Sequence, residues 1–294
     1  MRYRVVHKTE YAYAQPVALC HNEVHLQPRN CERQSCIGHR LDIDPVPESV
    51  SEREDFFGNP VCYFAIQHGH NRLAVTATSE VELQNRIFPP GTAPARPWEE
   101  TAARLREDLS PAVLDARQFA LGSPSVSPAP EIARYSEQIF WPGRPLIEAV
   151  RALMDSIHRD FVYDPGFSTV ATPIAVVFEH RRGVCQDFAH LALACLRSQG
   201  LAARYVSGYL ETLPPPGGEK LIGADASHAW FSVFEPEIGW LDFDPTNNQT
   251  PAERHIILAW GRDYSDITPL KGVIYGGGSH RTTVSVEVSA LPSV

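Results

Sequence analysis

Three residues far apart along the chain have the side chains of a nucleophilic catalytic group: Cys185, His228 and Asp244. A thiolate can attack a carbonyl carbon, an imidazole can hold the thiolate and then protonate a leaving amine, and a carboxylate can orient that imidazole. Each residue alone also fits an ordinary structural role, as a buried helix cysteine, a strand-end histidine or a turn-capping aspartate. Their order and spacing together favour acyl transfer through a thioester.

A helix that begins near Cys185 and ends at Gly200 would carry the thiol. Apolar residues recur along it at three- and four-residue spacing, which gives one buried face. Unpaired backbone N–H groups and the positive end of the helix dipole meet in its first turn, so a thiol there loses its proton more easily. The backbone N–H of Cys185 is also a natural oxyanion donor. Cys195, ten residues later, fits an inert buried cysteine instead.

His228 and Asp244 lie on two predicted strands that form a hairpin, with Glu235 to Gly239 between them. If the turn centres on Pro236 or Glu237, His228 lies opposite Asp244 or next to it diagonally, within reach of its side chain. Asp242 points to the same face of an ideal strand. Because Pro245 ends the strand, we favour Asp244 over Asp242 as the third member.

The sequence does not identify a second oxyanion donor. The candidates are Gln186, Trp230 and Tyr163. A proline- and glycine-rich loop, Leu213 to Lys220, is expected to be mobile and close to the substrate.

Composition limits the class of protein. The chain has 294 residues, of which 43% are hydrophobic and 21% charged, as in ordinary globular proteins. Its net charge of −9 argues against nucleic acid or an anionic membrane surface as partner. No signal core or spanning apolar run is apparent, and the 6 cysteines form no disulfide-scaffold pattern, so the cytoplasm is the expected location. We find no phosphate-cradling glycine loop, and no cofactor is expected.

Residues 1–88 are predicted to form an antiparallel β-sandwich, because short alternating runs are separated by turn signals such as Gln15-Pro16. Cysteines and histidines within residues 20–39 allow a zinc site as one interpretation. Their spacing lacks the paired pattern of a compact structural site, so we expect no metal there. The residues concerned are Cys20, His21, His25, Cys31, Cys36 and His39.

Composition changes after residue 88. Residues 89–145 are predicted to be a helical connector, residues 146–270 the α+β core, and residues 271–294 a final strand and tail. The tail could pair with either domain, and the sequence does not decide between them.

Several blocks of sequence resemble those of the bacterial transglutaminase-like family. The core blocks are Arg182-Gly183-Val184-Cys185-Gln186-Asp187, Ala203-Arg204-Tyr205-Val206-Ser207-Gly208-Tyr209, His228-Ala229-Trp230 and Asp244-Pro245-Thr246-Asn247. Blocks such as Leu26-Gln27-Pro28-Arg29 and Asp55-Phe56-Phe57-Gly58-Asn59 resemble the β domain that precedes this core in many members. The resemblance implies a papain-like α+β core with Cys185, His228 and Asp244 as its triad. We interpret Asp187 and His190, which are also part of the family motif, as structural.

The function expected from these observations is thiol-dependent acyl transfer on amide bonds of a peptide or protein. Hydrolysis is favoured over cross-linking, because excluding water requires a closed apolar acceptor tunnel that the sequence does not show. The alternatives are an amine-accepting transglutaminase and a non-catalytic peptide-binding module, and the complete triad argues against the second of these. Neither the substrate nor the oligomeric state is predicted.

Overall fold

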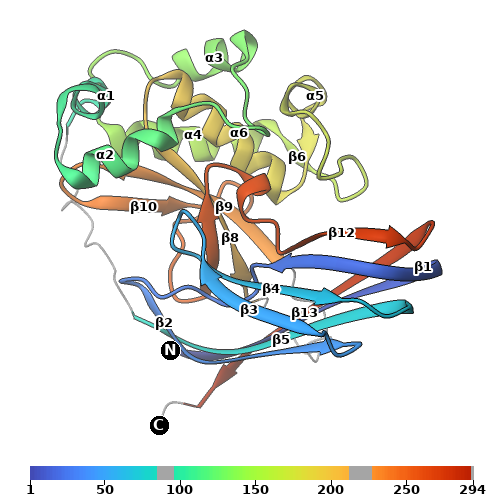
Figure 1. The fold of residues 1–294 in the computed structure, drawn as a ribbon. Coiled ribbons are helices and arrows are strands. Elements are labelled where there is room, and N and C mark those ends of the chain that lie inside the picture. The colour runs from blue at the N-terminus through green and yellow to red at the C-terminus, as the bar shows by residue number, and fades with distance from the viewer. Residues whose placement is uncertain (85–95, 212–226, 293–294) are drawn as a thin grey trace, which may run out of the picture.

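The computed structural model describes residues 1–84, 96–211 and 227–292, so the predicted loop from Leu213 to Lys220 lies outside the described residues. The helices gather at one end of the molecule, a four-stranded sheet runs beneath them, and a seven-stranded sheet forms the other end (Figure 1). None of the described helices is long and apolar enough to cross a membrane.

The N-terminal region and the last two strands build the seven-stranded antiparallel sheet. This confirms the antiparallel strands of the predicted β-sandwich, which the structure joins in one sheet through β1. Its strand order is β2-β5-β1-β4-β3, and both β12 and β13 also pair with β1. The strands are β1 (Arg2–Val24), β2 (Gln34–Asp44), β3 (Ser49–Glu54), β4 (Pro60–Ile66), β5 (His70–Leu83), β12 (Leu270–Gly276) and β13 (His280–Leu291).

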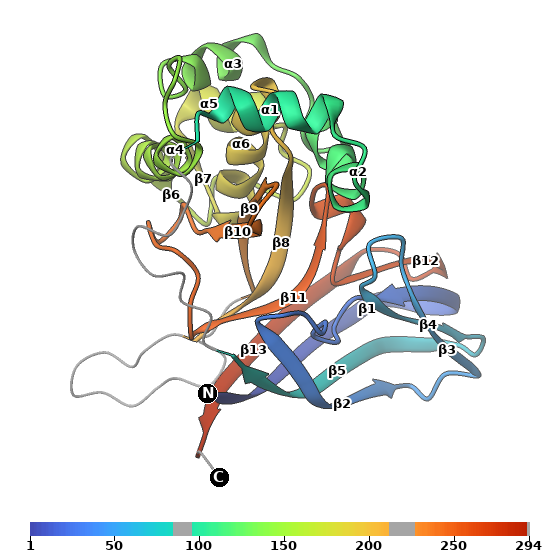
Figure 2. The same ribbon diagram turned by 90° about the vertical axis from the view of Figure 1, so that its left-hand side faces the viewer.

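Strand β1 is continuous over 23 residues, so the turn predicted at Gln15-Pro16 is wrong. Its pairing with β5 shifts in register between Ala12 and Val17, and such an irregularity tolerates a proline that has no N–H to donate. The first half of β1 pairs with β5 and β13, and the second half with β4 and β12. The C-terminal tail therefore pairs with the N-terminal sheet, the choice that the sequence left open. Figure 2 shows β13 alongside β1, and the register places Leu291 opposite Arg2.

The core sheet is antiparallel with the order β10-β9-β8-β11. Its strands are β8 (Ala203–Leu210), β9 (Ser227–Glu235), β10 (Gly239–Phe243) and β11 (His255–Gly261), and a separate short parallel pair is β6 (Val162–Tyr163) with β7 (Arg182–Gly183). The helices are α1 (Trp98–Glu107), α2 (Pro111–Arg117), α3 (Pro130–Glu137), α4 (Leu146–Asp160), α5 (Ile174–His180), α6 (Cys185–Ser198) and two 3₁₀ turns at Gln118–Ala120 and Tyr264–Asp266.

Helix α6 lies at the centre of the helical layer and packs on β8 and β9. Its inward residues are fully buried, among them Ala189, Leu193 and Leu196. The same hydrophobic core includes Ala102 of α1 and Ile132 of α3, so helices of the segment 89–145 pack directly on α6 and its neighbours. This packing fixes the first turn of α6 relative to the sheet.

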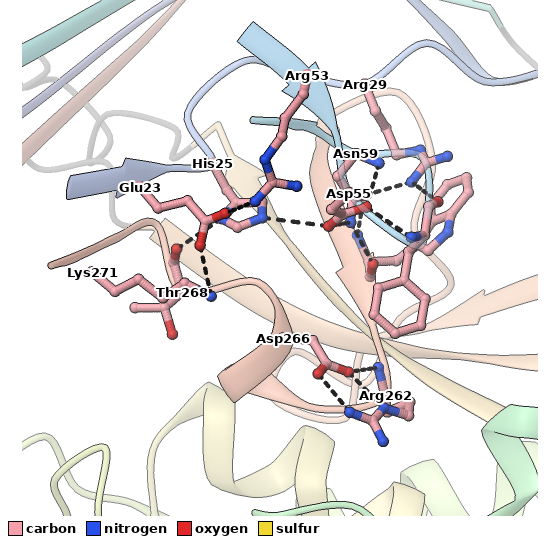
Figure 3. Close-up of polar contacts among 12 residues, drawn as sticks. Glu23, His25, Arg29, Arg53, Asp55, Asn59, Arg262, Asp266, Thr268 and Lys271 are labelled. Atoms are coloured by element: carbon pink, nitrogen blue, oxygen red, sulfur yellow. Dashed lines mark hydrogen bonds and ion pairs between the residues drawn. The ribbon is translucent and has the colours of Figure 1, made fainter. Parts of the chain in front are cut away.

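A second hydrophobic core joins the two sheets, because Tyr209 and Ile256 of the core sheet pack among N-terminal residues such as Phe64. Polar contacts extend this junction (Figure 3). The Arg29 guanidinium lies 3.2 Å from the ring centroid of Trp260, and its Nη1 donates to Asn59. The N-terminal sheet is therefore attached to β11, the strand that carries Trp260.

Acidic side chains order the loops on the N-terminal side of the junction (Figure 3). The Asp55 carboxylate accepts hydrogen bonds from the backbone and side chain of Asn59 at 2.8 and 2.7 Å. His25 Nε2 lies 3.4 Å from the same carboxylate. These bonds hold the turn after β3 in the position from which Asn59 reaches β11.

Candidate active site

The first turn of α6 is fixed by Asp187, whose carboxylate accepts the backbone N–H of Val184 at 2.8 Å and the Ser168 hydroxyl. Gly183 is required at this bend, because a Cβ there would lie 2.7 Å from Asp187 Oδ2. Cys185 follows directly as the first residue of the helix and is half-buried. Asp187 thus has the structural role that we expected, and the thiol sits beside the unpaired N–H groups of the helix N-terminus.

His228 and Asp244 meet through the hairpin of β9 and β10. The register pairs Glu235 with Gly239 and Phe231 with Phe243, so the turn centres on Glu237. Asp244 is then a diagonal neighbour of His228, and His228 Nε2 lies 2.8 Å from Asp244 Oδ2.

The Cys185 thiol is the second side-chain hydrogen-bond partner that acts on His228. With Nε2 engaged by the carboxylate, Nδ1 is the ring nitrogen left for the sulfur. The structure therefore joins His228 to Asp244, and the Cys185 thiol acts on the same ring.

The electrostatics favour a charged imidazole. Burial alone would lower the pKa of His228, but the hydrogen bonds to Asp244 and Cys185 outweigh burial and raise that pKa to about 10. Burial would raise the pKa of Asp244, yet hydrogen bonds from His228 and His255 hold it well below its ordinary value. At neutral pH the site therefore holds an imidazolium against a carboxylate.

The Asp244 carboxylate accepts hydrogen bonds from two backbone and three side-chain groups. Oδ1 accepts the backbone N–H groups of Thr246 and Asn247 at 3.0 and 3.2 Å. Oδ2 accepts from His228, from Asn247 Nδ2 at 2.7 Å and from His255 Nε2 at 3.1 Å. These five hydrogen-bond donors stabilise the ionised form of Asp244, although its side chain is fully buried.

Sequence reasoning did not find His255. A signal was present, because residues 256–260, directly after His255, are an apolar, β-branched and aromatic run that ends at Gly261, which is typical of a buried strand. That run is β11, and its pairing with β8 brings its first residue behind Asp244.

Two family models match the chain. Residues 3–82 match the bacterial transglutaminase-like N-terminal region, and residues 133–245 match the transglutaminase-like superfamily. The chain belongs to the transglutaminase-like superfamily. The second match includes all three residues of the candidate site, and membership supports thiol-dependent acyl transfer as the general activity.

Relatives of this transglutaminase-like protein include an uncharacterised protein of Mycobacterium tuberculosis, which is 44% identical over 99% of this chain and 93% of the relative. A protein-glutamine gamma-glutamyltransferase of Pseudomonas aeruginosa is 31% identical over 43% of this chain and 21% of that protein. Among solved structures, a candidate cysteine protease from Cytophaga hutchinsonii superposes with a TM-score of 0.79 at 21% identity, over 100% of this chain and 92% of that one. This likeness confirms the predicted α+β fold.

The transglutaminase-like site contains a second aspartate nearby, Asp242, with different contacts. Asp242 accepts the Ser232 hydroxyl and forms an ion pair with Arg33. It therefore faces the junction with the N-terminal region, whereas Asp244 faces His228.

The three candidates for a second oxyanion donor lie in different surroundings. Trp230 is fully buried, its ring is packed edge-on against His255, and its Nε1 has no hydrogen-bond partner among the described residues. Tyr163 is 52% exposed, and its pKa is raised, first by burial and then by the electrostatic effect of the nearby Cys185. Gln186 is half-buried in the first turn of α6. The assignment of a second donor stays a prediction for all three.

Cys195 and His190 belong to the core of the fold. Cys195 is fully buried, and burial raises its pKa, as expected for an inert thiol. His190 Nε2 accepts the backbone N–H of Tyr264 at 3.2 Å, and burial lowers its pKa to about 4, so it is neutral and structural.

One group of described side chains is close enough to share a metal ion: His228, Asp244 and His255, whose ligand atoms lie within 4.8 Å of one another. Both imidazoles already contact Asp244 Oδ2 through Nε2, the atoms that a metal would need. We therefore interpret this group as a hydrogen-bonded relay.

The cysteines and histidines of residues 20–39 form no such group among the described residues. Their side chains have separate partners: His21 contacts Tyr63, His25 contacts Asp55, and His39 contacts Ser79.

Proposed function

We propose that this protein hydrolyses amide bonds of a peptide or protein substrate through a thioester on Cys185. The observation that carries the proposal is the position of His228, which bonds Asp244 through one ring nitrogen and has the Cys185 thiol as its other partner. In this arrangement His228 is the acid and base, and Asp244 fixes its tautomer and orientation.

The reaction follows from the proton positions. The Cys185 thiolate attacks the carbonyl carbon, a C–S bond forms, and the carbonyl oxygen takes the displaced electron pair towards the backbone N–H of Cys185. The C–N bond then breaks as His228 gives its Nδ1 proton to the leaving nitrogen. Water next attacks the thioester and gives a proton to His228, the C–S bond breaks, and thiolate and imidazolium are restored.

Access of water supports hydrolysis as the second step. Tyr163, beside Cys185, has 52% of its surface exposed, and its neighbour Val162 has 62%. Cys185 is itself only half-buried, which supports access of water to a thioester on its sulfur.

Mass spectrometry of a glutaminyl peptide, incubated with and without a primary amine, tests the proposal. We expect the Cys185-dependent product to be the hydrolysed or deamidated peptide in both reactions, with the Cys185→Ala variant inactive. Amine incorporation that dominates over hydrolysis would overturn the preference for water. The relative from Pseudomonas aeruginosa that is named a protein-glutamine gamma-glutamyltransferase supports that second candidate function.

We further propose that the protein acts in the cytoplasm, on peptide or protein and not on nucleic acid or membranes. All six cysteines are free, which supports a reducing compartment. The net charge of −9 disfavours polyanionic partners.

A further inference from the structure

The proposed reaction assigns no role to His255, the second histidine that contacts Asp244. His255 Nε2 lies 3.1 Å from Oδ2, the same oxygen that His228 Nε2 contacts at 2.8 Å. The His255 side chain is buried, and Trp230 packs edge-on against its ring with centroids 5.3 Å apart. Solvent therefore does not compete for this contact.

The direction of the hydrogen bond follows from the charge of His255. Burial lowers its pKa, whereas the hydrogen bond to Asp244 and the charge of that carboxylate raise it, and the positive charges of His228 and Arg33 lower it again. The net shift is downward, so the ring is neutral and carries one proton at pH 7. A carboxylate oxygen can only accept, so that proton lies on Nε2. His255 is therefore a donor to Asp244.

Two donors on one oxygen share its negative charge. An imidazolium that faces an unshared buried carboxylate is held tightly and gives up its proton with difficulty. Each further donor to Oδ2 weakens that hold while the carboxylate stays ionised. The charged groups that act on the His228 and His255 rings come from three directions: Cys185 from α6, Asp244 after β10, and Arg33 from the N-terminal region.

We propose that His255 is a positioning residue that shares the Asp244 carboxylate with His228 and so keeps His228 acidic enough to protonate the leaving amine. The inference rests on the proposed function of the triad. It gives β11, and the N-terminal sheet attached to β11, a part in the chemistry, because His255 is the first residue of that strand.

The first test measures protonation without relying on activity. Histidine side chains labelled with ¹⁵N are titrated by NMR in the Cys185→Ala protein, alone and combined with His255→Leu or His255→Gln. Loss of the second donor in His255→Leu should raise the pKa of His228 by about one unit. The Gln side chain keeps an N–H donor and should keep the pKa near that of the parent.

The matched control is His7→Leu. His7 is as deeply buried as His255, burial lowers its pKa to about 4, and it bonds Tyr209 at 3.0 Å and not Asp244. Like His255→Leu, this variant should lower the unfolding temperature, but it should leave the pKa of His228 unchanged. A general effect of removing a buried histidine is thereby separated from an effect on Asp244.

The second test uses the intact thiol. Once the wild-type protein has shown Cys185-dependent turnover, His255→Leu should lower kcat roughly tenfold with KM changed less than about twofold, and His255→Gln should restore most of kcat. An inactive wild type would contradict the proposed function and leave the titration as an independent test of His255.

Three results would overturn the role of His255. The first is a His228 pKa that is unchanged or lowered in folded His255→Leu. The second is an equal loss of kcat in the His255→Gln and His255→Leu variants. The third is stoichiometric binding of added Zn²⁺ that shifts both histidine signals and is lost in His255→Leu.

Discussion

The side-chain amide of Gln34 pairs with the backbone of Ile257 as a neighbouring strand would. Ile257 N–H donates to Gln34 Oε1 at 2.7 Å, and Gln34 Nε2 donates back to the Ile257 carbonyl at 2.6 Å. The side-chain amide of Asn59 pairs with the backbone of Trp260 in the same way. Trp260 N–H donates to Asn59 Oδ1 at 3.0 Å, and Asn59 Nδ2 donates to the Trp260 carbonyl at 2.8 Å. Two side chains of the N-terminal region thus satisfy the outer edge of β11 and attach it to the rest of the protein.

Replacing Gln34 with alanine should therefore destabilise the protein. The change leaves the N–H and C=O of Ile257 without these partners in a buried place, which costs about 2–3 kcal/mol of unfolding free energy. Denaturant unfolding measures it. Gln67→Ala, at an exposed position, is the control and should change the free energy by less than about 0.5 kcal/mol. Equal values for both variants would mean that the amide does not hold β11.

The triad makes a graded prediction for turnover. Cys185→Ala should abolish it and His228→Ala nearly so, while Asp244→Asn should lower kcat on the order of a hundred- to ten-thousand-fold. Asp242→Asn is the matched control, since it removes contacts to Ser232 and Arg33 and should lower stability more than kcat. If Asp242→Asn lowered kcat strongly and Asp244→Asn did not, the assignment of Asp244 as the third member of the triad would be wrong.

The protonation of His228 predicts an unusually alkaline limit to activity. Its raised pKa means that the imidazolium is present at neutral pH and is lost only as the pH rises through about 10. The alkaline limb of kcat/KM should therefore fall near pH 10. Asp244→Asn removes the negative charge that raises the pKa of His228. The alkaline limb of the variant should therefore shift to lower pH, towards the ordinary histidine pKa of 6.5. A wild-type limb near pH 7 would contradict the ion pair.

Gly208 should not tolerate even a methyl group. A Cβ on this β8 residue would lie 2.1 Å from the Ile256 carbonyl and 2.5 Å from the Trp230 ring, so β11 or Trp230 would have to move. We expect Gly208→Ala to cost more than about 3 kcal/mol of stability, measured by thermal unfolding. Gly69→Ala, with nothing within 4 Å of the added Cβ, should be close to neutral.

Alkylation should distinguish the two helix cysteines. At neutral pH, iodoacetamide should label Cys185 at least about a hundredfold faster than Cys195, because Cys195 is fully buried and its pKa is raised. Peptide mass spectrometry after timed quenching gives both rates. Equal labelling would favour a non-catalytic peptide-binding module.

The sequence by itself predicted what depends on local structure. The helix that begins at Cys185 follows from apolar spacing and a glycine before it, and the pairing of strands 227–235 and 239–243 follows from a short hairpin loop. Hairpin geometry fixes the register of His228 and Asp244 within a few residues, so their proximity was predictable.

Only the tertiary structure decided what depends on contacts between distant segments. His255 reaches Asp244 because β11 pairs with β8, and β13 pairs with β1, a choice that alternation of side chains leaves open. The turn expected at Gln15-Pro16 is part of a continuous strand, because neighbours on both sides of β1 supply the pairing that local turn signals oppose. Strand pairing over long sequence separations is set by which faces the whole chain can bury together, and no local pattern contains that information.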